Sequence, residues 1–179
     1  MENGYLKIIL GCMYAGKTSK LINIYNMMKL SNIPTIVINY EEDNRYDVNL
    51  LSTHDKKMIP CVKTIKLFDL IETVEITEKV IIINEGQFFP DLEKFVKTML
   101  DKKKHIYVCG LDGDYQMKKF GQILDIIPLC NEVEKLNAIC AMCKNGTKAY
   151  FTLRLTCEKD QKVIGSENYI PVCRNCHLI

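Results

Sequence analysis

The sequence predicts an α/β protein in which a parallel sheet is flanked by helices and followed by a small zinc-ribbon-like domain. Three observations lead to this prediction. Short apolar runs alternate with helical patterns along most of the chain, the first run leads directly into a phosphate-loop motif, and two cysteine pairs stand near the C-terminus. We therefore expect a P-loop α/β domain over residues 1–135 and a zinc-binding domain over residues 136–179.

The apolar runs have the character of buried strands. Residues 35–40 and 80–83 are β-branched and lack polar alternation, as expected for strands that are covered on both faces. Asp91 precedes a segment in which apolar residues recur at helical spacing. Strand–helix alternation with this period predicts βαβ units and a parallel sheet. In chain order the alternating segments read YLKIILG, SKLINIYNMMKL, TIVINY, KLFDLIETV, KVIIIN, DLEKFVKTMLDKK and HIYVCGL.

Composition and charge exclude several classes of protein. The chain has 179 residues, of which 47% are hydrophobic and 26% charged, which is ordinary for a globular protein. A net charge of +2 argues against a strongly basic nucleic-acid surface. The first residues lack the basic region of a signal peptide, and no run approaches the ~20 apolar residues of a membrane helix. We expect a cytoplasmic protein without nucleic-acid or membrane partners.

The stretch GCMYAGKT has the phosphate-loop pattern G-x-x-x-x-G-K-T. Its glycines allow backbone N–H groups to point at phosphate oxygens, and the helix that follows adds its positive end. Lys17 is expected to reach the β and γ phosphates, and the Thr18 hydroxyl to coordinate Mg²⁺. A glycine-containing strand–helix turn is the alternative, but the flanking strand and helix favour a loop that binds a nucleoside triphosphate. The expected ATP-binding residues are Gly11, Cys12, Met13, Tyr14, Ala15, Gly16, Lys17 and Thr18.

A polar pair, Asn84 and Glu85, ends the apolar run at residues 80–83. Reactive groups in open parallel sheets lie at this carboxyl edge, beside the phosphate loop. Many P-loop proteins place an aspartate here for the metal, whereas Asn84 offers an oxygen without the charge. Glu85 is then the nearest candidate for a general base, unless it is merely an exposed glutamate. Phe88 follows, and could belong to the core or stack on a flat substrate.

The chain has nine cysteines, for which metal binding is a better explanation than disulfides in a reducing compartment. Two C-x-x-C pairs can supply four thiolates to one tetrahedral ion, which leaves no free position, so the zinc should be structural. His177 would be a fifth donor and is expected on the surface. The pairs also close a long loop, and long loops in compact proteins are often functional. The four ligands are Cys140, Cys143, Cys173 and Cys176.

These motifs, in this order, resemble the type II thymidine kinases of the cellular and poxvirus-like kind. The resemblance rests on the phosphate loop, NEGQFF (84–89), GLDGDYQMKKFG (110–121) and the paired C-x-x-C motifs. The family's loop reads G-P-M-[FY]-[SA]-G-K, so Cys12 replaces its proline. Its D-N-R-Y and T-H-D segments match residues 43–46 and 53–55. Its acidic strand end reads D-E-[AG]-Q-F-F, so Asn84 replaces its aspartate.

The resemblance implies an ATP-dependent thymidine kinase that phosphorylates the 5′-hydroxyl of thymidine to give dTMP. It implies that Glu85 is the catalytic base, that Phe88 stacks on thymine, and that Met13 faces the 5-methyl group. The zinc-tethered loop would be the family's lasso, which reads the base through main-chain groups. ATP with Mg²⁺, one Zn²⁺ per chain, feedback inhibition by dTTP and a homotetramer, or dimer of dimers, are implied as well. The implied nucleoside-binding residues are Met13, Phe88, Leu111, Tyr115, Thr152, Lys162, Val163, Ile164, Gly165 and Tyr169.

Two other functions are compatible with parts of the sequence. A nucleic-acid-dependent ATPase could combine a phosphate loop with a zinc ribbon, but it should have a basic, aromatic-rich face. A nucleotide-binding regulator that lost catalysis would explain Asn84. Arg45 is either a phosphate clamp or a solvated loop arginine, and Asp43 is the reserve candidate for the base.

Overall fold

A computed structural model of the protein describes residues 3–41, 50–52, 57–163 and 165–178. Its centre is a six-stranded sheet with the strand order β5-β2-β6-β7-β1-β8. All neighbouring strands in it run parallel, which confirms the predicted parallel sheet. The strands are β1 (Tyr5–Gly11), β2 (Thr35–Tyr40), β5 (Val62–Thr64), β6 (Val80–Ile83), β7 (His105–Gly110) and β8 (Glu132–Leu136).

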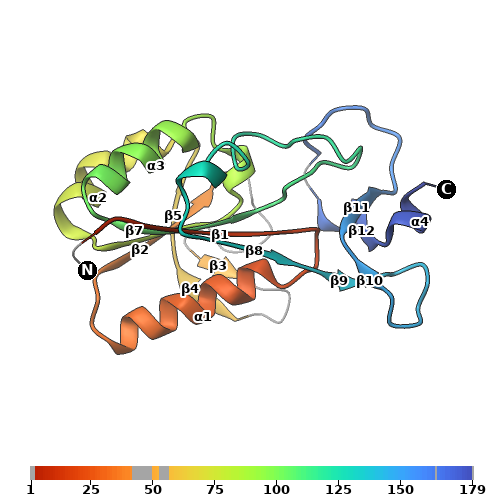
Figure 1. The fold of residues 1–179 in the computed structure, drawn as a ribbon, viewed down its shortest axis with the longest axis horizontal. Coiled ribbons are helices and arrows are strands. Elements are labelled where there is room, and N and C mark those ends of the chain that lie inside the picture. Colours follow the sequence, from red (N-terminus) through yellow and green to blue (C-terminus); the bar gives the residue numbers. More distant parts are fainter. Residues whose placement is uncertain (1–2, 42–49, 53–56, 164, 179) are drawn as a thin grey trace.

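Helices cover both faces of this sheet (Figure 1). Helix α1 (Lys17–Leu30) lies on one face, together with the small strands β3 (Leu50–Ser52) and β4 (Met58–Pro60), and helices α2 (Ile71–Thr77) and α3 (Leu92–Asp101) lie on the other. Because successive side chains of a strand point to opposite faces, each strand contributes to two cores. In β1, alternate residues pack toward α3, whereas Ile9 packs toward α1. The β1 residues on the α3 side are Leu6, Ile8 and Leu10.

Helix α3 buries the apolar stripe that its spacing predicts, formed by Leu92, Phe95, Val96 and Met99. Asp91 precedes it, but the Asp91 side chain makes no capping hydrogen bond to α3. Its carboxylate instead accepts hydrogen bonds from the backbone N–H groups of Leu67 and Phe68, at 3.2 and 3.0 Å. These two residues begin the 3₁₀ helix η1 (Leu67–Leu70). Asp91 therefore links two helical segments that are distant in the sequence.

The chain after β8 forms two small antiparallel sheets at the carboxyl end of β1 (Figure 1). Two contacts join them to the phosphate loop. The Cys12 thiol donates to the Ala149 carbonyl over 3.4 Å, and the Met13 N–H donates to the Thr152 hydroxyl over 3.0 Å. The elements after β8 are β9 (Ala138–Ile139), β10 (Lys148–Ala149), β11 (Phe151–Arg154), the 3₁₀ helix η4 (Ser166–Asn168), β12 (Tyr169–Val172) and α4 (Arg174–His177). The 3₁₀ helices η2 (Gly86–Phe88) and η3 (Ile127–Leu129) lie earlier in the chain.

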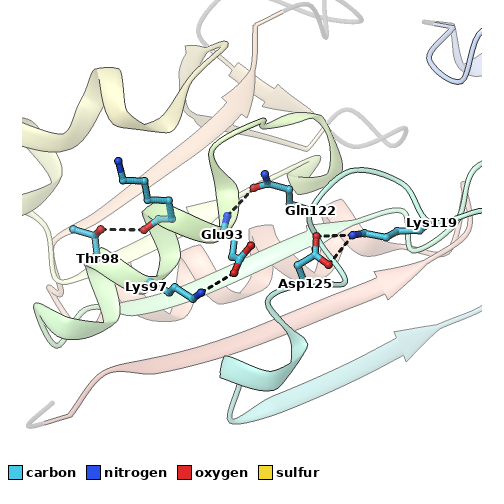
Figure 2. A network of polar contacts seen from close by, with 7 residues as sticks. Glu93, Lys97, Thr98, Lys119, Gln122 and Asp125 are labelled. Carbon is cyan, nitrogen blue, oxygen red and sulfur yellow. Dashed lines mark hydrogen bonds and ion pairs between the residues drawn. The ribbon is translucent and has the colours of Figure 1, made fainter.

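One hydrogen bond attaches the segment at residues 119–125 to helix α3, and ion pairs lie within each of the two segments (Figure 2). The backbone N–H of Glu93 donates to the Gln122 side chain over 3.0 Å. Lys119 contacts both carboxylate oxygens of Asp125 at 2.6 Å. The Glu93 carboxylate itself pairs with Lys97 on the exposed surface of α3. Over the described ranges, no helix is long and apolar enough to cross a membrane.

Candidate active site

The phosphate loop joins the end of β1 to the start of α1, as its motif predicts. Gly11 has a φ of 153°, and a Cβ atom at this position would lie 2.8 Å from the Leu136 carbonyl oxygen. Gly16 has a φ of 83°, a conformation that side-chain-bearing residues rarely adopt. Tyr14 also has a positive φ, 63°. The close approach to Leu136 therefore requires glycine at position 11, and the positive φ favours glycine at position 16.

Lys17 lies folded against the loop, with only 8% of its surface exposed. Its ammonium group donates a hydrogen bond to the Cys12 carbonyl over 2.8 Å. A lysine ammonium has three N–H donors, so this contact leaves capacity for phosphate oxygens. Thr18 lines the same cavity as Lys17. The loop thus holds a buried positive charge at the start of a helix, where a polyphosphate can bind.

A cavity of about 480 Å³ lies between the phosphate loop, the carboxyl ends of the sheet strands and the C-terminal loop. This volume is in the range of small-molecule sites. Gly11 and Cys12 do not line it, and Ile164 lies outside the described residues, as do Asp43, Arg45 and residues 53–55. The expected site residues that line it are Met13, Tyr14, Ala15, Gly16, Lys17, Thr18, Glu85, Phe88, Leu111, Tyr115, Thr152, Lys162, Val163, Gly165 and Tyr169.

Several lining residues were not selected from the sequence: Asn39, Tyr40, Asp114, Phe120 and Gln161. The sequence did contain a signal for Asn39 and Tyr40. They end β2 at the same sheet edge at which Asn84 follows β6, and the carboxyl edge of a parallel sheet is where sites form. Asp114 and Phe120 belong to the motif at residues 110–121, but nothing in that motif indicated that these two side chains reach the cavity. Gln161 carries no motif, because only the folding of the C-terminal loop brings it there.

Glu85 begins the turn after β6 in a left-handed conformation, with φ 54° and ψ 44°. Such a backbone costs of order 1 kcal/mol for a non-glycine residue and is typical of functional positions. The Glu85 carboxylate accepts a hydrogen bond from the Gln87 amide over 2.7 Å. The oxygen of that amide accepts one from the Leu111 N–H over 3.0 Å. The buried Gln87 therefore fixes the Glu85 carboxylate at the rim of the cavity.

Asn84 connects three strand ends and is 1% exposed. Its amide NH₂ donates to the Asn39 side-chain oxygen over 2.9 Å, and its own oxygen accepts from the Cys109 thiol over 3.0 Å. Burial, with a smaller effect of the Glu85 charge, raises the pKa of Cys109 to about 12, so the thiol keeps its proton. An amide suits this position because it must donate and accept at the same time.

Aromatic rings form one wall of the cavity. The Phe88 ring lies 5.2 Å from the Tyr40 ring and 5.4 Å from the Phe120 ring, centroid to centroid. The Lys162 ammonium stands 4.3 Å from the Tyr40 centroid and 5.2 Å from that of Phe88, and donates to the Tyr40 hydroxyl over 3.1 Å. A planar heterocycle can stack on such a surface while polar groups at its edge bind to the loop.

The four predicted cysteine ligands come together at the base of the C-terminal loop. Their sulfurs all lie within 4.8 Å of one another. Cys143 is 3.7 Å from Cys173 and 3.5 Å from Cys176, sulfur to sulfur. Tetrahedral zinc with bonds of about 2.3 Å places its sulfurs roughly 3.8 Å apart. The backbone N–H of Cys173 also donates to the Cys140 sulfur over 3.3 Å, which favours a thiolate. The cluster therefore fits a zinc ion.

The expectation of a surface position for His177 is wrong. His177 is half-buried, and its Nε2 atom lies 2.9 Å from the Tyr115 carbonyl oxygen. Its ring contacts that of Phe151 edge to face, 5.8 Å between centroids. The short helix α4 turns this side chain toward the segment at residues 110–121. His177 thus joins the cysteine cluster to a segment that lines the cavity.

Comparison with known proteins gives matches over almost the whole chain. A family model described as thymidine kinase matches residues 4–177. The thymidine kinase of Variola virus is 39% identical over 179 residues, which cover 99% of each chain. That of Vaccinia virus (strain Western Reserve) is 38% identical with the same coverage. That of Sheeppox virus (strain KS-1) is 37% identical and covers 100% of this chain and 99% of its own.

Proposed function

This chain belongs to the thymidine kinase family, and we propose that it transfers the γ-phosphate of ATP to the 5′-hydroxyl of thymidine and forms dTMP. The observation that carries the proposal is that Lys17, Glu85 and Phe88 line the same cavity. A phosphate-binding cation, a carboxylate and a stacking surface are the three groups that a nucleoside kinase needs.

In the proposed mechanism Glu85 accepts the proton of the 5′-hydroxyl as its oxygen attacks the γ-phosphorus in line. Gln87 holds the carboxylate in place for this step. Lys17 and the loop N–H groups bind the phosphate oxygens on which negative charge accumulates. Mg²⁺ bound with ATP would neutralise part of that charge, and the Thr18 hydroxyl is the group that would hold it.

For the nucleoside, we propose that Phe88 stacks on the thymine ring and that Met13 faces its 5-methyl group. The Met13 backbone N–H donates a hydrogen bond to the Thr152 hydroxyl, which holds these two cavity-lining residues next to each other. The lasso over residues 162–165 would contact the polar edge of the base, with Leu111, Tyr115 and Tyr169 beside it. Inhibition by dTTP in the same cavity, a homotetramer and the two-domain division at residues 135 and 136 belong to the same proposal.

A radiolabelled phosphate-transfer assay with a panel of nucleosides tests this function. We expect label from [γ-³²P]ATP to appear in dTMP when thymidine is offered. A nucleic-acid-dependent ATPase would release phosphate only when nucleic acid is added. A regulator without catalysis would bind nucleotide and transfer none. Either of the last two results would replace the proposal.

We expect one Zn²⁺ per chain, bound by the four clustered cysteines. Cys140→Ser should lower the metal content and weaken thymidine binding, because the base of the long loop is then untied. Metal analysis by mass spectrometry and thymidine titration measure the two effects. Cys157→Ser is the control, since Cys157 is exposed and outside the cluster. Unchanged metal content in Cys140→Ser would contradict the assignment.

Asn84→Asp introduces the aspartate that the family's strand-end motif has at this position, and it should change both the stability and the Mg²⁺ dependence. A carboxylate cannot donate to Asn39, so we expect the free energy of unfolding to fall by about 1–3 kcal/mol. A charged oxygen near the phosphate loop also attracts Mg²⁺ more strongly than an amide does, so half-maximal rate should need less Mg²⁺. Denaturant unfolding and Mg²⁺ titrations of the rate measure these effects. Unchanged values of both would mean that Asn84 has neither role.

A further inference from the structure

Arg154 is the last residue of β11 and is only 7% exposed. A guanidinium has five N–H donors, and five hydrogen bonds account for all of them. Two go to the Tyr169 hydroxyl, from Nε over 3.2 Å and from Nη2 over 2.8 Å. The pair Arg154–Tyr169 also forms the last register position of the β11–β12 sheet.

The other three donors bind the backbone of the loop that begins after Arg154. Nη1 donates to the carbonyls of Glu158 and Asp160, over 2.9 and 2.6 Å. Nη2 donates to the carbonyl of Gln161 over 3.0 Å. Three backbone carbonyl groups of this loop therefore accept hydrogen bonds from the same buried guanidinium.

The face and the neighbours of the guanidinium connect it to the cavity. Its carbon lies 3.8 Å from the centroid of the Tyr115 ring. The Tyr169 hydroxyl, which Arg154 holds, donates in turn to the Val163 carbonyl over 2.9 Å. The Gln161 amide donates to the Asp114 carboxylate over 2.7 Å. Arg154 does not line the cavity, but Tyr115, Gln161 and Tyr169 do.

We propose that Arg154 is the positioning residue that gives the lasso its nucleoside-binding conformation. It acts through the residues it touches and makes no contact with substrate. The inference rests on the proposed function, since it assigns Arg154 to the thymidine side of the site. The effect of losing Arg154 should be confined to the thymidine side, because the phosphate loop accepts none of the Arg154 hydrogen bonds. Loss of the guanidinium should therefore impair thymidine binding far more than ATP binding.

Two substitutions separate this role from simple stabilisation. Arg154→Lys keeps the charge but has only three donors and lacks the planar geometry of a guanidinium, and Arg154→Met keeps only the apolar part of the side chain. For both we expect the KM for thymidine to rise about 10-fold or more, while the KM for ATP stays within about twofold. Arg154→Lys should recover only part of the loss, because it cannot bind all the carbonyls. Arg174→Met is the control, since Arg174 is exposed, stacks on the Phe151 ring at 4.7 Å from its centroid, and is not among the residues that line the cavity.

Hydrogen–deuterium exchange on the zinc-loaded protein gives a second readout that does not depend on activity. Exchange over residues 155–163 should be faster in both Arg154 variants, with residues 5–30 unchanged. If Arg154→Met does not fold, Arg154→Lys decides the question. A folded variant with unchanged exchange in this loop and an unchanged KM for thymidine would overturn the inference. If the wild type phosphorylates no thymidine, the proposed function fails, and exchange still tests whether Arg154 orders the loop.

Discussion

Lys17→Ala is expected to lower the rate of phosphoryl transfer by about 10³-fold or more and to leave the fold intact. Lys17 is the buried cation of the phosphate loop, and in the proposed mechanism its charge stabilises the phosphate oxygens as the bond to the leaving group breaks. The substitution also removes the hydrogen bond to the Cys12 carbonyl, which contributes about 1 kcal/mol to stability. The chemical effect should therefore greatly exceed the structural one.

Lys20→Ala is the matched control for this experiment. Lys20 lies one turn further along the same helix and pairs with Glu134 over 2.9 Å, with 42% of its side chain exposed. We expect this variant to keep its rate within about twofold, because an exposed ion pair of this kind is worth at most about 1 kcal/mol. Single-turnover transfer from [γ-³²P]ATP measures the rate, and circular dichroism checks the fold. A folded Lys17→Ala protein with near-normal turnover would remove the phosphate-loop assignment.

Glu85→Gln should keep nucleotide and nucleoside binding but lower kcat by about 10²-fold or more, the scale of a lost general base. The substitution is nearly isosteric, and the amide oxygen of glutamine can still accept the hydrogen bond from Gln87. A fall in rate would then report the loss of the base and not a rearranged turn. Glu93→Gln is the control, because Glu93 is an exposed carboxylate of α3 that pairs with Lys97 (Figure 2).

Mg²⁺ dependence separates two roles for Glu85. If Glu85 is the base, the variant should need the same Mg²⁺ concentration for half-maximal rate as the wild type. If Glu85 serves the metal because Asn84 is uncharged, the variant should need more Mg²⁺ and bind ATP more weakly. Titrating Mg²⁺ in both proteins measures this. A Glu85→Gln enzyme with normal rate and normal metal dependence would exclude both roles.

The sheet and the main helices were predictable because their signals are local. The apolar runs at residues 35–40 and 80–83 became β2 and β6, buried and parallel, since an unbroken β-branched run can only be accommodated where both faces are covered. The stripe that contains Phe95 became the buried face of α3. Asp91 shows the limit of such reasoning, because its partners lie in η1 and are far away in the sequence.

Most of the candidate site was also predictable, because short motifs carry it. The spacing in residues 11–18 and in the two C-x-x-C pairs specifies which atoms can meet, since loop closure and ligand geometry leave little choice. Asn84 was correctly identified as the residue after a buried strand. Its partners, Asn39 and Cys109, could not be inferred.

The sequence by itself determined the parallel α/β fold, the phosphate loop and the cysteine cluster, because each depends on residue types at fixed short separations. Only the tertiary structure decided how the C-terminal loop is held. The five hydrogen bonds of Arg154 and the contact of His177 with Tyr115 depend on segments that share no sequence pattern. Such contacts form where packing brings a buried donor close to unpaired carbonyl groups, and the need to satisfy both specifies the geometry.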